Sequence, residues 1–322
     1  MRVRFWGTRG SIPVALTAAD IRDRLAQALL AASGRQFASF GEARAFAERE
    51  LPFSLSHTYG GHTSCVELET GHDDYFVCDM GSGARAFGAH VLARQGGRPA
   101  TINVFMSHVH WDHIMGFPFF GPAYVPGTRI RIHGCHEVLE QALRLQQAPP
   151  CFPVPFDQLG ATIEFVKLIP GQTREVSGLS VTPLLQHHSG DSYGFRFAAQ
   201  GKSVVYSTDS EHKLEERSET ERFVAFFRDA DLVIFDAMYS LADAISVKAD
   251  WGHSSNVIGV ELCQMAQARH LVLFHHEPAN NDTAIEGLLK DARRLEELTR
   301  GAQKPPHPLL ISAAHDGLEI DL

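Results

Sequence analysis

Short apolar runs that end in polar residues recur along this chain of 322 residues. Each run has the length of a strand, and many runs end in Gly, Asp, Ser or His. The expected strands are Arg2–Trp6, Cys65–Leu68, Tyr75–Cys78, Ile102–Met106, Ile130–His133, Leu179–Leu185, Ser203–Ser207, Leu232–Phe235 and Leu271–Phe274. Apolar positions at helical spacing lie between them, over Ala18–Ala32, Phe40–Leu51, Glu137–Gln147, Ser218–Phe227, Ser255–Ala268 and Thr283–Leu298. This order of elements predicts an α/β or a layered α+β fold.

Two of the expected helices fall within residues 17–56, between two segments of strands and loops. Thr17 is a suitable N-cap for the first of these helices. We therefore expect a helical insertion within a single domain that spans residues 1–322. The insertion could cover a site, form a helical pair packed on the surface, or build a dimer interface.

Composition and charge narrow the function classes. The chain is 44% hydrophobic and 21% charged, as in ordinary globular proteins. Its net charge of −9 disfavours a broad basic surface for extended nucleic acid. Five cysteines without a CxxC spacing disfavour a disulfide framework and indicate a reducing cytosol. No run reaches transmembrane length and no signal-peptide pattern is present, so we expect a cytoplasmic protein without a membrane partner.

The stretch SHVHWDH, residues 107–113, holds three of the 18 histidines and follows an expected strand directly. His108 and His110 are two residues apart, so an extended backbone places them on one side. Asp112 and His113 follow as the chain turns. Imidazole and carboxylate together suit zinc, manganese or iron. The stretch therefore predicts metal ligands; a surface cluster of histidines is the alternative.

Further candidate ligands stand at the ends of later strands. His187 and His188 follow one strand, Asp209 follows the next, and His275 and His276 follow the last. Strand ends that meet at one edge of a sheet can bring such side chains together. The whole set is large enough to be shared between two ions.

The order of HxHxDH, then histidine, aspartate and histidine at strand ends resembles the metallo-β-lactamase fold superfamily over most of the chain. The resemblance implies an α+β fold, a four-layer αββα sandwich with a dinuclear site at one edge. It implies one metal held by His108, His110 and His188, another held by Asp112, His113 and His275, and Asp209 as the bridge. The sequence DMGSG at residues 79–83 matches the family's strand-end aspartate and glycine turn, which supports such a site from behind.

The resemblance also selects one histidine from each pair. In the phosphodiesterase-like branch, the third histidine lies six residues before the glycine of a Gly-Tyr or Gly-Phe pair, which here favours His188 over His187. The motif HHEP favours His275 over His276. The unselected histidines are expected behind the ligands or in a pocket wall. His110 stands where flavodiiron oxidoreductases usually carry glutamate, so it favours hydrolysis over oxygen reduction.

The motifs FWGTRGSIP, YGGHTSCVEL and WGHSS resemble the subgroup near ribonuclease Z and the cyclic-nucleotide phosphodiesterases. That subgroup usually has asparagine where this chain has His62. His253 in WGHSS matches a histidine that faces the phosphate and can protonate the leaving oxygen; packing at a helix start is the alternative. Four aromatic residues could wall a nucleobase pocket or belong to the core, namely Phe117, Phe119, Phe120 and Trp251.

The function implied is hydrolysis of a small phosphodiester, a 3′,5′-cyclic nucleotide or another cyclic phosphate. Two divalent metal ions, zinc first and manganese or iron as alternatives, would ionise a bridging water. Asp112 would orient the resulting hydroxide or take its proton, and His253 would act as general acid.

Four alternatives stay open. A tRNA 3′-end endonuclease usually has a Gly/Pro/Lys-rich arm, which the segment between Gln141 and Gly178 does not resemble. The others are a lactone or thioester hydrolase, a mononuclear-iron sulfur dioxygenase, and a non-catalytic binding protein. The expected partner is a small phosphodiester substrate, and a homodimer is compatible with the sequence.

Overall fold

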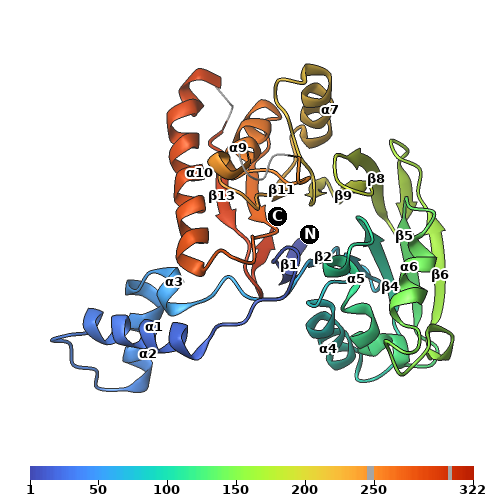
Figure 1. Cartoon of the computed structure of the whole chain (residues 1–322), viewed down its shortest axis with the longest axis horizontal. Helices are drawn as coiled ribbons and strands as arrows, with labels where there is room; N and C mark the ends of the chain where they lie inside the picture. The colour runs from blue at the N-terminus through green and yellow to red at the C-terminus, as the bar shows by residue number, and fades with distance from the viewer. Residues whose placement is uncertain (245–249, 304–306) are drawn as a thin grey trace.

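Two seven-stranded sheets face each other in the computed structural model, which describes residues 1–244, 250–303 and 307–322 (Figure 1). The first sheet has the order β14-β1-β2-β3-β4-β5-β6 and the second β13-β12-β11-β10-β9-β8-β7. The first sheet consists of β1 (Arg2–Gly7), β2 (Cys65–Glu69), β3 (Tyr75–Cys78), β4 (Thr101–Met106), β5 (Arg129–Gly134), β6 (Thr162–Lys167) and β14 (Glu319–Asp321). The second consists of β7 (Arg174–Val176), β8 (Leu179–Gln186), β9 (Ser192–Ala199), β10 (Lys202–Ser207), β11 (Leu232–Asp236), β12 (His270–Phe274) and β13 (Leu310–Ala313).

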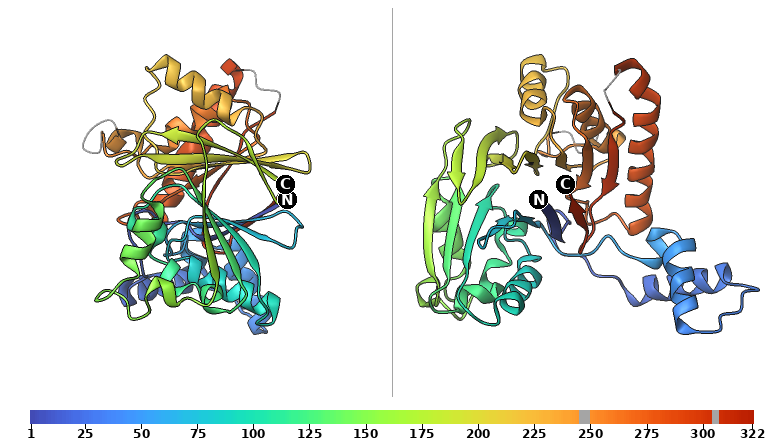
Figure 2. Two further views of the ribbon diagram at one scale, coloured as in Figure 1. Left: turned by 90° about the vertical axis from the view of Figure 1, so that its right-hand side faces the viewer. Right: turned by 180° about the vertical axis from the view of Figure 1, so that it is seen from behind.

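Helices cover the outer face of each sheet, as Figure 2 shows. The first sheet packs against α4 (Ala84–Gln95) and α6 (Leu139–Gln146), and the second packs against α7 (Arg217–Phe227), α9 (Asn256–Met265) and α10 (Asp282–Gln303). Aromatic rings fill the space between the sheets. The ring of Phe5 lies 6.1 Å from that of Phe274, and Phe105 lies 5.1 Å from Phe197. The predicted four-layer αββα sandwich is confirmed.

Strand direction brings the polar strand ends to one edge of the sandwich. Strands β3, β4, β5 and β6 run parallel in the first sheet, and β10, β11, β12 and β13 run parallel in the second. Strand β8 runs the same way as β10, because β9 is antiparallel to both. Directly after these strands come Asp79, His108, His188, Asp209 and His275.

The expected strands all form, with each end shifted by at most one residue, but the sequence expectation missed five strands and one long helix. The missed strands include β6, β9 and the short edge strands β7, β13 and β14. The missed helix α4 carries Gly88 at its centre, which weakens a helical pattern. That glycine has a packing reason, since a Cβ there would lie 2.9 Å from the ring of Phe120.

The segment between β1 and β2 forms α1 (Ala18–Ala31), α2 (Phe40–Glu50) and α3 (Phe53–Ser56), and it projects from the body beside α10 (Figure 1). Thr17 caps α1 as predicted, because its hydroxyl accepts from Asp20 N–H and the Asp20 carboxylate accepts from Thr17 N–H. An ion pair from Arg24 to Asp282 fastens the segment to α10, yet no residue of α1 is buried. None of the described helices is long and apolar enough to cross a membrane.

Candidate metal centre

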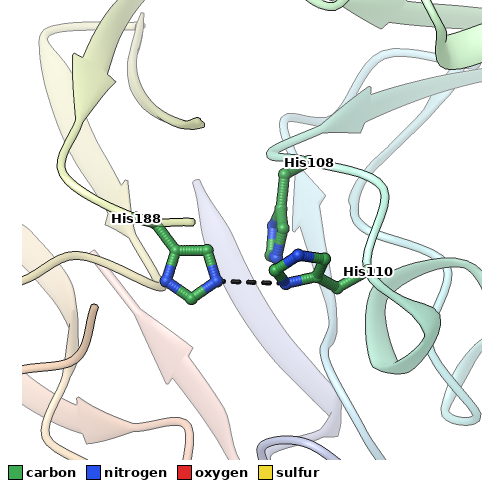
Figure 3. A group of neighbouring side chains, drawn as sticks. All are labelled: His108, His110 and His188. Carbon is green, nitrogen blue, oxygen red and sulfur yellow. Dashed lines mark hydrogen bonds between the residues drawn. The ribbon is translucent and has the colours of Figure 1, made fainter. Parts of the chain in front are cut away.

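Three histidines from two loops form the first group of side chains at the polar edge, the three-histidine group (Figure 3). His108 and His110 follow β4, and His188 follows β8. His188 Nε2 lies 3.1 Å from His110 Nδ1, and the rings of His108 and His188 are 5.0 Å apart. One ligand atom from each residue lies within 4.8 Å of the others. His108 is buried, His188 is half-buried and His110 is exposed, so this group is open to solvent on one side.

A second group, the carboxylate group, consists of Asp112, His113, Asp209 and His275, all of which are buried. Asp112 Oδ2 lies 3.2 Å from Nε2 of both histidines. Asp209 Oδ1 lies 3.1 Å from His113 Nε2 and 3.3 Å from His275 Nε2. The four side chains therefore converge on one point.

Asp209 faces both groups at once. Its Oδ1 points to the carboxylate group, while its Oδ2 lies 3.7 Å from Nε2 of both His108 and His188. Its backbone is left-handed, with a φ of 47°. Such a conformation costs a non-glycine residue about 1–3 kcal/mol and persists where the surrounding structure enforces it. Asp79 and His275, which also end strands at this edge, share it with φ of 59° and 60°.

Asp79 braces the cluster from behind. Its Oδ2 accepts hydrogen bonds from His113 Nδ1 at 2.8 Å and from the hydroxyls of Ser107 and Tyr206 at 2.7 Å. A histidine whose Nδ1–H is held by a carboxylate presents its Nε2 lone pair to the opposite side. His113 Nε2 is the atom that faces the carboxylate group, so the orientation suits a metal ligand.

The charges at this edge fit divalent cations. Among the described residues, Nε2 of His108 and Nε2 of His113 are buried without a hydrogen-bond partner. Burial, with neighbouring His113, lowers the pKa of His108 well below its ordinary value, which keeps its lone pair free. Burial alone would raise the pKa of Asp209, but His275, His113 and His108 hold it well below the usual range. Two buried carboxylates and the imidazole nitrogens that converge on them form a set of donor atoms that suits a divalent cation.

The loop Gly7–Ser11, near the N-terminus, packs against the carboxylate group. The backbone N–H of Ser11 donates to Asp112 Oδ2 at 2.8 Å. A Cβ on Gly10 would lie 2.5 Å from the ring of His275, so the loop backbone packs directly on that ligand. Gly10 of the motif GTRGS therefore lets the loop backbone lie closer to His275 than a residue with a larger side chain would allow.

In each pair of adjacent histidines, one histidine belongs to a ligand group and the other does not. His187 lies outside both groups, and its Nε2 donates to Glu219 Oε2 at 3.0 Å. His276 is buried and donates to the carbonyl of Ala314 at 2.8 Å. His62 lies 3.2 Å from the hydroxyl of Ser82, in the loop before β2.

His253 lies against both groups, with ring centroids 5.0 Å from His188 and 5.1 Å from His275. Its Nδ1 donates to Asp236 Oδ2 at 2.8 Å. Burial would lower the pKa of His253, but Asp236 and the carboxylates beyond it raise that pKa to about 9. The sequence expectation did not single out Asp236, although it ends an apolar strand just as the candidate ligands do.

The aromatic residues considered for a pocket wall divide into two kinds. Phe117 and Phe120 are buried in the core beneath α4, where the ring of Phe120 stacks 5.7 Å from that of Phe87. Phe119 and Trp251 are exposed. Only these last two have surface to offer a ligand.

Residues 75–276 match the family model described as a beta-lactamase superfamily domain. The chain belongs to this superfamily. A ribonuclease Z from Staphylococcus haemolyticus is 26% identical over 41% of this chain and 41% of its own length. The metallo-β-lactamase fold protein YhfI from Bacillus subtilis superposes with a TM-score of 0.65 at 18% identity, over 99% of this chain and 98% of its own. Unliganded yeast PDE1 gives 0.59 at 14% identity, over 81% and 95%.

The resemblance to the metallo-β-lactamase fold, in the branch near ribonuclease Z and the phosphodiesterases, is thereby confirmed. The family match and the histidine–aspartate cluster identify a metal-binding hydrolase of this fold. All seven candidate ligands named from the sequence lie in the two groups.

Proposed function

We propose that the chain is a phosphodiesterase with two divalent cations, zinc in the first place and manganese or iron as alternatives. One observation carries the proposal: the two carboxylate oxygens of Asp209 face two separate groups of ligands. His108, His110 and His188 would hold one cation, Asp112, His113 and His275 would hold the other, and Asp209, whose carboxylate faces both groups, would serve both. When bound, such a pair of cations supplies Lewis acidity and lowers the pKa of a coordinated water.

Two residues of the chain act on the attacking water and on the leaving oxygen. Asp112 is fixed by the N–H of Ser11, so its carboxylate is placed to orient the attacking water or to accept its proton. His253 Nδ1 donates its hydrogen bond to Asp236, so Nε2 is the nitrogen that can donate a proton to the leaving oxygen. Its position beside His188 and His275 places that donor at the shared boundary of the two groups.

We propose a small substrate, a 3′,5′-cyclic nucleotide or another cyclic phosphate. The net charge of −9 disfavours a grip on extended nucleic acid. The projecting segment 17–56 contains five Asp or Glu and five Arg residues and no Lys, so it lacks the positive charge of a tRNA-binding arm. The segment between Gln141 and Gly178 contains one Lys and includes the end of α6 and the strands β6 and β7, which disfavours a basic arm there as well.

A tRNA 3′-end endonuclease is the second candidate, because a curated relative is named ribonuclease Z. The deciding experiment uses enzyme of measured metal content. Its substrates are bis-(p-nitrophenyl) phosphate, cyclic nucleotides, linear dinucleotides, precursor tRNA, and a lactone and a thioester. Preferred turnover of a cyclic phosphate supports the proposal. Preferred cleavage of precursor tRNA, or turnover of only the lactone or thioester, would overturn it.

A further inference from the structure

We propose that Glu211 is a positioning residue for the three-histidine group, acting on His188 through the backbone of residues 250–252. The inference rests on the metal centre of the proposed function. It concerns a residue that makes no contact with the ligand atoms, and it predicts that one of the two cations depends on this carboxylate more than the other does.

Hydrogen bonds on both sides of Gly252 link Glu211 to His188. The carboxylate accepts the N–H of Asp250 on Oε1 at 3.3 Å and the N–H of Gly252 on Oε2 at 3.2 Å. The carbonyl of Gly252 in turn accepts His188 Nδ1–H at 2.9 Å. Because Nδ1 is held, Nε2 is the nitrogen that faces His110 Nδ1, 3.1 Å away.

Gly252 allows this contact because it has no side chain. Its φ is +83°, and a Cβ there would lie 2.5 Å from His188 Nδ1. The loop backbone therefore rests directly on the imidazole ring. A shift of the loop would move the acceptor carbonyl and free the ring to turn.

The arrangement differs from the one at His113, where a carboxylate holds Nδ1 directly. At His188 the backbone of residue Gly252 stands between the carboxylate and the imidazole. The N–H and the carbonyl of Gly252 belong to different peptide groups, so Glu211 acts on His188 by fixing the position of this residue and of its acceptor carbonyl, which sets the orientation of the imidazole ring and of its Nε2.

The surroundings of Glu211 make the idea testable without unfolding the chain. Glu211, Gly252 and His188 line a cavity of about 360 Å³, and the Glu211 side chain is 16% exposed. Shortening it enlarges an existing cavity, which costs less than opening a void in a packed core. Lys213, which lies 2.6 Å from Asp250 and 3.6 Å from Glu211, still ties the loop in place.

The experiment compares the wild type with Glu211→Ala, Glu211→Gln and the control Glu216→Ala. Glu216 is a suitable control because it lines the same cavity and its replacement by Ala also removes one negative charge. Zinc affinity is measured by competition with a chromophoric chelator, and the cobalt-loaded proteins are compared by their absorption spectra.

For Glu211→Ala we expect one of two zinc equivalents to bind about 10- to 100-fold more weakly, the range for lost partners of metal-bound histidines. The other equivalent keeps its affinity, and the cobalt spectrum changes at one site. Glu211→Gln retains one acceptor oxygen and falls between, while Glu216→Ala matches the wild type.

Two results would overturn the inference alone: two unchanged zinc affinities in Glu211→Ala, or an equal loss at both sites with a lower unfolding temperature of the metal-free protein. A wild type that binds fewer than two equivalents overturns the proposed metal centre, and the inference with it.

Discussion

The two ligand groups differ in charge and in exposure, although Asp209, a member of the carboxylate group, also faces the three-histidine group. The three-histidine group consists of imidazoles alone, and one of them, His110, is exposed. The carboxylate group is fully buried and adds Asp112, with His113 braced directly by Asp79. A buried carboxylate needs a positive charge to compensate it and so favours tight retention of a cation, whereas an exposed site made of imidazoles alone exchanges its cation more readily. We therefore expect a firmly held cation beside a more labile one.

The largest effect should come from removing what the two groups share. Asp209→Asn keeps the size of the side chain but removes the charge that faces both groups. We expect loss of both cations and a fall of activity to background. Elemental analysis after dialysis, alongside the phosphodiesterase assay, measures this. Retention of two cations would contradict the bridging role.

The next effect distinguishes the groups. His110→Ala removes the exposed ligand, so one cation and the activity should be lost together while the carboxylate group keeps its cation. His187→Ala is the matched control, because His187 stands beside a ligand but bonds to Glu219 instead. Equal metal loss in both variants would refute the division between the two histidines.

His253→Ala tests the donor at the boundary of the groups. We expect kcat to fall by about 100- to 10,000-fold, the usual contribution of a general acid. Metal content should stay near that of the wild type, because His253 is assigned to neither group. Loss of a cation in this variant would make His253 a ligand and remove the general-acid assignment.

The smallest effect is expected from Asp79→Asn, which weakens the brace of the carboxylate group. The amide can no longer accept from His113 Nδ1 and two hydroxyls with full charge. Zinc at the carboxylate group should bind about 10- to 100-fold more weakly. The three-histidine group should be spared. A uniform loss at both groups would show that Asp79 does not discriminate between them.

Much of the fold could be predicted because the apolar runs are short, regular and closed by polar residues. The runs that became β3, β4, β10, β11 and β12 are buried on both faces and stand out in the sequence. Four of the five missed strands, β6, β7, β13 and β14, lie at sheet edges, where strands bury less and carry weaker patterns, whereas the missed β9 lies inside the second sheet. Helix α4 was missed because Gly88 interrupts its pattern for a packing reason that lies on a distant loop.

The sequence by itself determined the chemical character of the site. HxHxDH after a buried strand, and histidines or aspartate after three later strands, specify nitrogen and oxygen ligands for a divalent cation. Local spacing suffices for this, because backbone geometry decides which side of the chain neighbouring residues face.

Only the tertiary structure decided which partners those ligands meet. Strand order in two sheets brings residues 108–113, 188, 209 and 275 to one edge, and the distances among them depend on packing between segments far apart in the chain. The same holds for Asp236 beside His253 and for Glu211 behind Gly252. Such contacts depend on loops that are far apart in the sequence and pack together in the folded chain, so no local pattern predicts them.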